Sequence, residues 1–281
     1  MAHRAENSVA TAPTATFTPC LNPSACRTLS FTLAPDPRYS AEAMHALILA
    51  AGRGMRLRSR HEPPKCLLNI GGVTLLDRYV RTLESIGVDI VVVAGYRADD
   101  VRGRLRQLAP AVDCTVVINR DFELGSIVSL ARGLEIVDGP LLLLDGDVLF
   151  HSELLTLLAA SAHENALLVD VGSAFTGEEY MTGIDDGRVH ALRRAMVTGY
   201  ASTGEWVGFA RLDAIAVNLL RAAIERQIAA GETAGGYEDA LASLLPDVHM
   251  HAENTSGLPW VEIDFPDDAA RGEALVRAGL L

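Results

Sequence analysis

Apolar residues between positions 45 and 171 form two kinds of pattern in alternation. Short unbroken apolar runs are typical of strands buried on both faces, whereas apolar residues spaced three and four apart indicate amphipathic helices. The runs predict strands at 45–50, 89–94, 114–118, 140–144 and 166–171. The helical patterns lie between them, at 74–86, 98–108, 125–136 and 152–162. This alternation predicts a Rossmann-like, doubly wound α/β fold with a mostly parallel sheet, whose ligands bind at the carboxyl ends of the strands.

The pattern changes after residue 172, where short strands are expected at 188–193 and 205–212 around a loop with Gly and Thr. We interpret this segment as an inserted antiparallel cap that covers the site. The rest of the chain predicts helices at 214–230, 236–245 and 267–278, with strands at 248–252 and 260–263. The sequence shows no internal repeat and no second apolar core, so we interpret residues 44–281 as one domain.

Residues 1–43 are rich in Ala, Ser, Thr and Pro and show neither the strand nor the helix period. We expect them to form a disordered N-terminal extension. Met44 stands directly before the first predicted strand and is a candidate for the true start of translation. A targeting segment is the weaker alternative. No apolar run approaches 18 residues, so a membrane span is not expected.

The composition narrows the classes of partner and the compartment. A formal net charge of −12 argues against general binding to nucleic acids or anionic membranes. The four cysteines show no metal-ligand spacing, so neither a zinc site nor a disulfide framework is expected. A cytoplasmic location is the simplest interpretation of this cysteine usage.

The segment after the first predicted strand departs from the acidic average. Gly52 and Gly54 let the backbone approach a ligand and present its N–H groups. The segment also carries five cations, namely Arg53, Arg56, Arg58, Arg60 and Lys65. Lys65 is the only lysine among the 24 Lys and Arg residues, and its ammonium is a compact charge that fits between phosphate oxygens. The segment predicts a triphosphate-binding site, and a solvated basic loop is the alternative.

Carboxylates follow two other predicted strands. Asp145 and Asp147 come after the apolar run at 140–144. Glu262 and Asp264 are two residues apart on a strand and therefore share a face. Like charges on one face repel unless a cation lies between them, so Asp147, Glu262 and Asp264 are candidates for a magnesium site. An Asx turn after the run at 140–144 and a solvated strand edge at 262–264 are the alternatives.

Weaker candidates lie elsewhere. Asn119, Ser126 and Ser129 flank the start of a helix, where they either bind a base or ribose or cap the helix. Arg193 and Arg194 lie in the inserted segment, where they either meet a second anion or stay solvated. For each group, the residue types leave both interpretations open.

The stretch from Leu49 to Arg56, followed by Pro64-Lys65, resembles the signature of the nucleotidyltransferases that make nucleotide-activated sugars and alcohols. The resemblance covers residues 45–150 well and the rest more loosely. Later features are similar to one branch of that family, the cytidylyltransferases that act on phosphocholine, inositol phosphate and phosphonates such as 2-aminoethylphosphonate. These features are Ser129-Leu130 after Asn119, the segments 204–211 and 237–240, and Glu262-Ile263-Asp264.

The resemblance implies a role for each matching residue. The phosphates would lie against Gly52, Arg53 and Gly54, and their charge would be neutralised by Arg56 and Lys65. Magnesium would be held by Asp147, Glu262 and Asp264. The base would lie near Ala50, Asn119 and Ser129, and the acceptor near Arg194 and Glu205. Two positions depart from the family pattern: Met55 replaces a common Thr, which counts against the sugar-1-phosphate branch, and Arg194 replaces a typical Lys.

We therefore predict a cytidylyltransferase that uses Mg²⁺, joins CMP from CTP to a small phosphonate or phosphate monoester, and releases pyrophosphate. A homodimer is one expected assembly. A sugar-1-phosphate nucleotidyltransferase using another NTP and a non-catalytic nucleotide-binding regulatory domain are the alternatives. The hypothesis requires Lys65 to lie within about 15 Å of residues 147 and 264, the span of a triphosphate with its metal.

Overall fold

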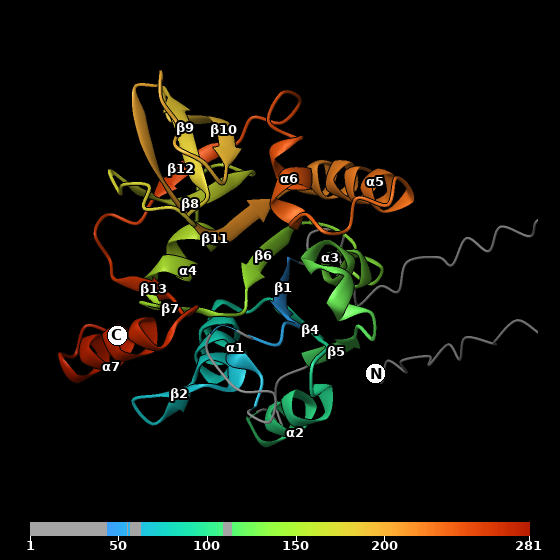
Figure 1. Cartoon of the computed structure of the whole chain (residues 1–281), viewed down its shortest axis with the longest axis vertical. Coiled ribbons are helices and arrows are strands. Elements are labelled where there is room, and N and C mark those ends of the chain that lie inside the picture. The colour runs from blue at the N-terminus through green and yellow to red at the C-terminus, as the bar shows by residue number, and fades with distance from the viewer. Residues whose placement is uncertain (1–43, 55, 57–62, 109–113) are drawn as a thin grey trace, which may run out of the picture. The chain divides into compact units, whose positions relative to one another are not determined.

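The computed structural model describes residues 44–54, 56, 63–108 and 114–281. These residues belong to one compact unit, built around a nine-stranded sheet in the order β5-β4-β1-β6-β11-β8-β12-β10-β9 (Figure 1). The expected extension at 1–43, and Met55, Arg58 and Arg60 of the basic segment, lie outside the described residues. None of the helices in the described ranges combines the length and the apolar character that crossing a bilayer requires.

One half of the sheet is parallel. β1 (His45–Ala50) lies between β4 (Asp89–Ala94) and β6 (Leu141–Asp145), and β5 (Cys114–Ile118) flanks β4. Three successive residues of β1, Ala46, Leu47 and Ile48, are fully buried, although their side chains alternate between the two faces of the sheet. Both faces of this half are therefore covered, which is why its strands appear as unbroken apolar runs in the sequence.

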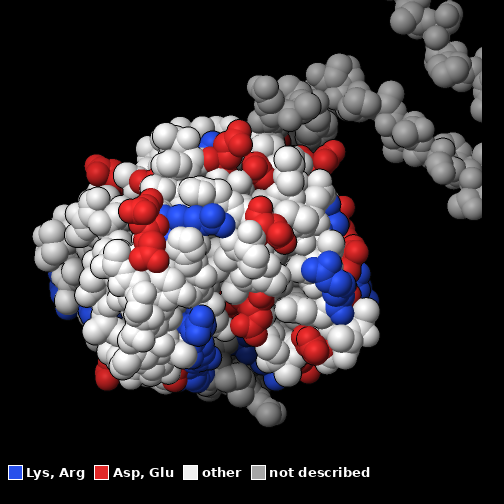
Figure 2. Space-filling model, turned by 90° about the horizontal axis from the view of Figure 1, so that it is seen from above, with Lys and Arg blue, Asp and Glu red and all other residues white. Residues whose placement is uncertain are grey.

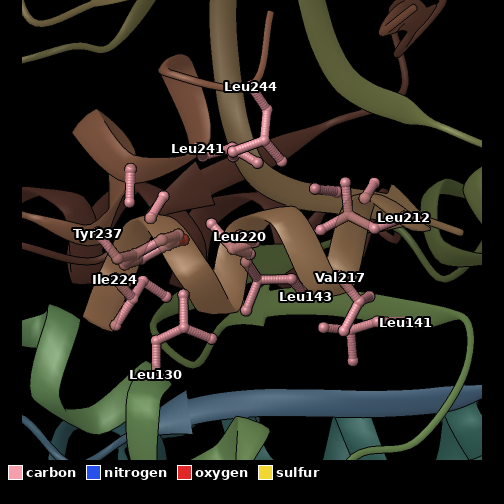
Figure 3. Close-up of a cluster of buried hydrophobic side chains, with 14 of the residues drawn as sticks. Leu130, Leu141, Leu143, Leu212, Val217, Leu220, Ile224, Tyr237, Leu241 and Leu244 are labelled. Atoms are coloured by element: carbon pink, nitrogen blue, oxygen red, sulfur yellow. The ribbon is translucent and has the colours of Figure 1, made fainter. Parts of the chain in front are cut away.

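The helices cover the two faces in separate groups. On one face, α3 (Ser126–Leu134), α5 (Ala214–Ala229) and α6 (Tyr237–Ala242) pack against the β6 side chains Leu141 and Leu143 (Figure 3). The opposite face is covered by α1 (Leu75–Ile86), α2 (Ala98–Leu108), α4 (Glu153–Ala159) and α7 (Pro266–Arg277). This is the doubly wound arrangement that the sequence predicts.

The other half of the sheet is mixed, and the long strand β11 (Ser202–Leu212) joins the two halves. Its second part pairs antiparallel with β6, and its first part pairs antiparallel with β9 (Met181–Asp185). Both parts pair with β8 (Ala166–Val171), with a register shift between Trp206 and Ala210. β12 (His251–Asn254) and β10 (Arg188–Arg193) complete a ring of strands that returns to β11 through β9.

A glycine permits the bend in β11. Gly208 has φ +88°, and a Cβ atom there would lie 2.6 Å from Asp145 Oδ2. Only glycine adopts this backbone conformation without strain, and only glycine leaves room for the Asp145 carboxylate. The register shift therefore falls where β11 passes the carboxyl end of β6.

The segments where prediction and structure differ lie mostly after residue 140. β9 (Met181–Asp185) was not predicted, because Thr and Gly interrupt its apolar pattern and its pairing with β10 and β11 makes it a strand. β12 begins at His251 rather than at 248, and α6 ends at Ala242 rather than at 245. Val248 and Met250 lie in irregular backbone, and their side chains are buried in the core. Their apolar character therefore indicated burial and not strand pairing.

Two short antiparallel pairs complete the fold. β7 (Val148–Phe150) pairs with β13 (Trp260–Glu262), and β2 (Asn69–Ile70) pairs with β3 (Val73–Thr74). In the first pair Glu262 lies opposite Val148, the residue after Asp147. A strand close to the end of the chain thus reaches the carboxyl end of β6.

Candidate functional site

The site begins where β1 and β6 end side by side. Gly146 donates its backbone N–H to the Leu49 carbonyl at 3.0 Å, and a Cβ atom at Gly146 would lie 2.6 Å from that oxygen. The turn after β6 therefore packs directly against the glycine-bearing segment after β1. Between them lies a small cavity of about 80 Å³, lined by Leu49, Ala50, Gly52, Gly54, Lys65, Cys66, Gly146 and Asp147.

Lys65 connects this cavity with two carboxylates. It is the first residue of a short 3-10 helix, Lys65–Leu67, and its side chain is only 12% exposed. Its Nζ donates to Asp147 Oδ2 at 2.8 Å and to Asp264 Oδ1 at 2.7 Å. Burial acts to lower the pKa of Lys65, but attraction to Asp147 and Asp264 outweighs it, so the pKa is raised and the group stays an ammonium. The distances are far shorter than the 15 Å that the sequence hypothesis requires.

Three carboxylates converge around this ammonium. One oxygen each from Asp147, Glu262 and Asp264 lies within 4.8 Å of the others, and Ile263 N–H donates to the Asp147 carbonyl at 3.0 Å. Burial, followed by repulsion from Asp147 and Asp264, raises the pKa of Glu262. Lys65 therefore compensates the triad only in part. Carboxylate oxygens at this spacing fit Mg²⁺, which takes few protein ligands and completes its shell with water and substrate phosphates.

Two tyrosines hold the turn that carries Asp147. The Tyr79 hydroxyl donates to the Asp145 carbonyl and accepts from the Val148 N–H at 3.2 Å. The Tyr237 hydroxyl donates to Asp145 Oδ1 at 2.9 Å. Asp145 thus has a structural contact on each side, in agreement with the turn alternative for this residue. Sequence reasoning did not predict this role for either tyrosine, although Tyr237 begins the segment 237–240 that carries part of the family resemblance.

Arg56 extends the site toward the inserted segment. Its Nη2 lies 2.9 Å from Asp264 Oδ2, and its Nη1 donates to Glu178. Arg194 Nη2 donates to the same Glu178 oxygen at 3.1 Å. The two arginines that were assigned to different substrates therefore meet at one carboxylate. Glu178 was not predicted, and it occupies the position where an anion would bridge two guanidinium groups.

Three of the residues predicted to bind the nucleotide make contacts within the protein. Arg53 pairs with Glu123, and its guanidinium lies 5.7 and 5.5 Å from the ring centroids of Tyr96 and Phe122. Asn119 and Ser129 are buried, and Asn119 Nδ2 donates to Ser129 Oγ at 3.0 Å. Asn119 and Ser129 thus stabilise the local structure through their hydrogen bond, and their contact with a base stays a prediction.

A much larger cleft of about 620 Å³ opens beside the triad. Its lining includes nine carboxylates, three arginines and four aromatic residues. The carboxylates are Asp145, Asp170, Glu178, Glu179, Glu205, Glu238, Glu262, Asp264 and Asp268, and the arginines are Arg56, Arg194 and Arg271. Burial, followed by the charges of Glu179 and Asp170, raises the pKa of Glu205 to about 7.

On the face in Figure 2, acidic and basic side chains of the described residues occur in small groups, and that face shows no continuous basic area. A surface that binds nucleic acids would need such an area. The expectation that nucleic acid is not a partner stays a prediction.

Comparison with known proteins finds a family model that matches part of the chain, and relatives and solved structures that resemble it. Residues 46–180 match the family model of the MobA-like NTP transferase domain. The bifunctional IPC transferase and DIPP synthase of Rubrobacter xylanophilus is 28% identical over 249 residues, which are 86% of this chain and 54% of that protein. The chain thus spans about half the length of this curated relative.

Two solved structures share the fold over nearly their whole length. The CTP:phosphocholine cytidylyltransferase of Streptococcus pneumoniae superposes with a TM-score of 0.68 and 19% identity, covering 83% of this chain and 99% of the other. The inositol-1-phosphate CTP transferase of T. maritima gives 0.68 and 21%, covering 86% and 99%. Likeness at these identities shows the fold, and it confirms the α/β architecture predicted from the sequence.

Proposed function

We propose, from the match of residues 46–180 to the MobA-like NTP transferase domain, that the chain is a cytidylyltransferase with a phosphate or phosphonate monoester as acceptor. In the proposed reaction, an acceptor oxygen attacks the α-phosphorus of CTP. The bond from that phosphorus to the bridging oxygen breaks, and pyrophosphate leaves with the electron pair. A phosphate monoester is largely dianionic near neutral pH because its second pKa is about 6, so no strong general base is needed.

The chief barrier to this reaction is repulsion between two anions. Lys65 would stabilise the charge that builds on the α-phosphoryl oxygens, and the segment at Gly52 and Gly54 would donate backbone N–H groups to the phosphates. Arg56 would add a second positive charge at the junction of nucleotide and acceptor. Asp147, Glu262 and Asp264 would hold Mg²⁺, which supplies charge neutralisation to the phosphates when bound.

One observation carries the proposal. Lys65 donates to Asp147 and Asp264, residues that are 82 and 199 positions away in the chain, at 2.8 and 2.7 Å. A lone lysine that meets a carboxylate triad beside a glycine-lined cavity is what transfer between two phosphorylated substrates needs. The glycine segment alone would serve binding, and the carboxylates alone would serve a metal.

CTP is proposed as the nucleotide because two proteins of this fold are named for it, the phosphocholine cytidylyltransferase and the inositol-1-phosphate CTP transferase. The sequence features at 204–211 and 237–240 support the same branch. The homodimer and the cytoplasmic location expected from the sequence stay predictions.

Pyrophosphate release tests the proposal directly. The purified chain is incubated with Mg²⁺, one acceptor from a panel of phosphonates and phosphoalcohols, and CTP, UTP, GTP or dTTP. We expect release with CTP, dependent on the acceptor. Release with another NTP and a sugar 1-phosphate would instead support the sugar branch. Binding of CTP without release for any acceptor would support a regulatory nucleotide-binding domain.

A further inference from the structure

Glu178 occupies the point in the large cleft where two arginine side chains converge. Its Oε2 atom accepts a hydrogen bond from Arg56 Nη1 and another from Arg194 Nη2, the second at 3.1 Å. A guanidinium keeps its charge at any working pH, so the pair offers two fixed positive charges to whatever anion lies between them. A carboxylate of the protein itself therefore fills an anion-binding position.

This position adjoins the carboxylate triad. The guanidinium of Arg56 that donates to Glu178 through Nη1 lies 2.9 Å from Asp264 Oδ2 through Nη2. Its central carbon lies 5.1 Å from the centroid of the Phe265 ring, which limits where the group can move. An anion in place of Glu178 would thus be one guanidinium away from Asp264. In the proposed reaction, this is where the phosphate or phosphonate of the acceptor meets the nucleotide.

The ion pairs of Glu178 are of a kind that a substrate can displace. The side chains of Glu178, Arg56 and Arg194 are all about half exposed. Ion pairs between exposed side chains are weak, because water screens the charges and two long side chains lose conformational freedom. A phosphate or phosphonate dianion has one more charge and one more oxygen than a carboxylate, so it competes effectively for two guanidinium groups.

The backbone around Glu178 is held independently of these ion pairs. The carboxylate of Glu179 accepts from the Thr176 hydroxyl and from the N–H groups of Thr176, Gly177 and Glu178, the three N–H contacts being 2.8, 2.9 and 3.1 Å long. The turn at 176–179 therefore keeps its own hydrogen bonds when Glu178 lets go of the arginines. Displacement needs only the rotation of one exposed side chain.

Building on the proposed transferase function, we propose that Glu178 is an internal competitor of the acceptor. Its carboxylate holds Arg56 and Arg194 in the free protein, leaves when the phosphate or phosphonate of the acceptor binds, and returns after transfer. Glu178 thereby lowers the affinity of the site for acceptor and product alike, because either must displace it to bind.

The reaction itself favours the return of Glu178. The acceptor group enters with two negative charges, and one of its oxygens becomes the bridge to the α-phosphorus of the transferred CMP. The same group then carries one negative charge, so its attraction to the two guanidinium groups weakens. The charge of Glu178 is unchanged by the transfer. Competition between the ligand and Glu178 therefore shifts toward Glu178 once the product has formed.

The Glu178→Gln variant tests the competition, because it keeps the size of the side chain and removes its charge. With CTP, Mg²⁺ and the acceptor that gives the highest rate, we expect KM for the acceptor to fall about 3–10-fold. The inhibition constant of the nucleotide-containing product should fall by a similar factor, and kcat should not rise. Glu178→Ala should act in the same direction. If Glu178 instead fixed the arginines in their binding positions, both variants would raise KM.

Glu135→Gln is the matched control. Glu135 is also an exposed carboxylate, and it pairs with Arg132 at 2.8 Å outside the cleft. This variant loses the same charge and an ion pair of the same kind, so its KM should equal that of the wild type. Arg194→Gln supplies a second check. In that background Glu178→Gln should lower KM by a smaller factor, because one of the two contested guanidinium groups is gone.

A binding experiment gives a readout that needs no turnover. Methyl phosphate is a dianion at pH 8, because the second pKa of a phosphate monoester is about 6. Isothermal titration calorimetry without CTP and Mg²⁺ should give a Kd for methyl phosphate about 3–10-fold lower in Glu178→Gln than in the wild type or in Glu135→Gln.

The outcomes separate the inference from the proposed function. An unchanged or higher KM and Kd in Glu178→Gln would overturn the inference and leave the transferase function standing. No binding of methyl phosphate to Glu178→Gln would overturn it as well. Failure to release pyrophosphate with every acceptor and nucleotide would overturn the proposed function, and the titration would then decide alone whether Glu178 competes with a phosphate for the two arginines.

Discussion

The two cavities of this site differ in size and in the balance of their charge. The lining of the small cavity after β1 includes three glycines, one cation, Lys65, and one carboxylate, Asp147, whereas the lining of the large cleft includes nine carboxylates and three arginines. Arg56 and the triad lie at the boundary between them. The contrast teaches that the donor and acceptor sides can be tested by separate substitutions.

The strongest test acts on the small cavity. Replacing Lys65 with Ala should lower turnover by about 10²–10³-fold or more, because a preorganised charge at the transferring phosphate is lost. Initial rates of pyrophosphate release measure this. Lys65→Arg should restore little activity, since a planar guanidinium does not replace a compact ammonium. Near-normal turnover in Lys65→Ala would remove the central assignment.

The boundary between the cavities is tested through the metal. Asp147→Asn should weaken Mg²⁺ binding by more than about tenfold, as the loss of a coordinating charge does. The readouts are the Mg²⁺ dependence of the rate and the increase in Tm on adding Mg²⁺ without nucleotide. Glu253→Gln, on β12, is a suitable control. An unchanged Mg²⁺ dependence in Asp147→Asn would show that the triad is not the metal site.

Stability of the shared turn can be probed without touching either cavity's charge. Tyr237→Phe removes the hydroxyl that donates to Asp145 and leaves a buried carboxylate oxygen unpaired. We expect the free energy of unfolding to fall by about 1–3 kcal/mol, measured by urea denaturation. A loss of less than about 0.3 kcal/mol would show that the Asp145 carboxylate finds another hydrogen-bond partner when the Tyr237 hydroxyl is removed.

The large cleft should show its own pH dependence. The pKa of Glu205 is raised in the folded chain to about 7 from 4.5, so between these values the unfolded state releases a proton that the folded state keeps. Glu205 therefore costs stability that grows as pH rises through this window. The gain in the free energy of unfolding of Glu205→Gln over the wild type, measured by urea denaturation, should be larger at pH 7.5 than at pH 5. An equal difference at both pH values would contradict the raised pKa.

The smallest effect is expected at the exposed bridge between the two arginines. Glu178 is half exposed, so Glu178→Gln should change the free energy of unfolding by less than about 1 kcal/mol. Thermal or urea unfolding checks this. A loss well above that value would mean that Glu178 holds the inserted segment in place rather than occupying an anion position.

The parallel half of the sheet and the small cavity after β1 were predictable because their signals are local. The apolar runs of β1, β4 and β6, the glycines after β1 and the Pro64-Lys65 ending each lie within a few residues. Parallel strand ends meet at one edge, so the proximity of Lys65 and Asp147 followed from the fold class. The prediction that Glu262 and Asp264 share a strand is wrong, because β13 ends at Glu262, although their carboxylate oxygens do converge.

The contacts in the large cleft were harder to predict because they are made between distant segments of the chain. Glu205 entered through family resemblance, but its position opposite Asp170 depends on a register that the bulge in β11 sets. Glu178 and Tyr79 carry no local pattern, and the segment that begins at Tyr237 gave no sign of its contact with Asp145. Asn119 and Ser129 were assigned to the base, yet each satisfies the other in the buried interior, a pairing that spacing along the chain does not reveal.

The bend at Gly208 has a consequence for how this protein can diversify. The residues of β11 after the bend are tied to β6, while those before it, including Glu205, are tied to β9 and β8. Because side chains alternate along a strand, inserting or deleting one residue at the bend would turn Glu205 to the opposite side without moving the catalytic edge. A change in chain length before Gly208 can thus alter the lining of the large cleft, while the residues after Gly208 keep their pairing with β6.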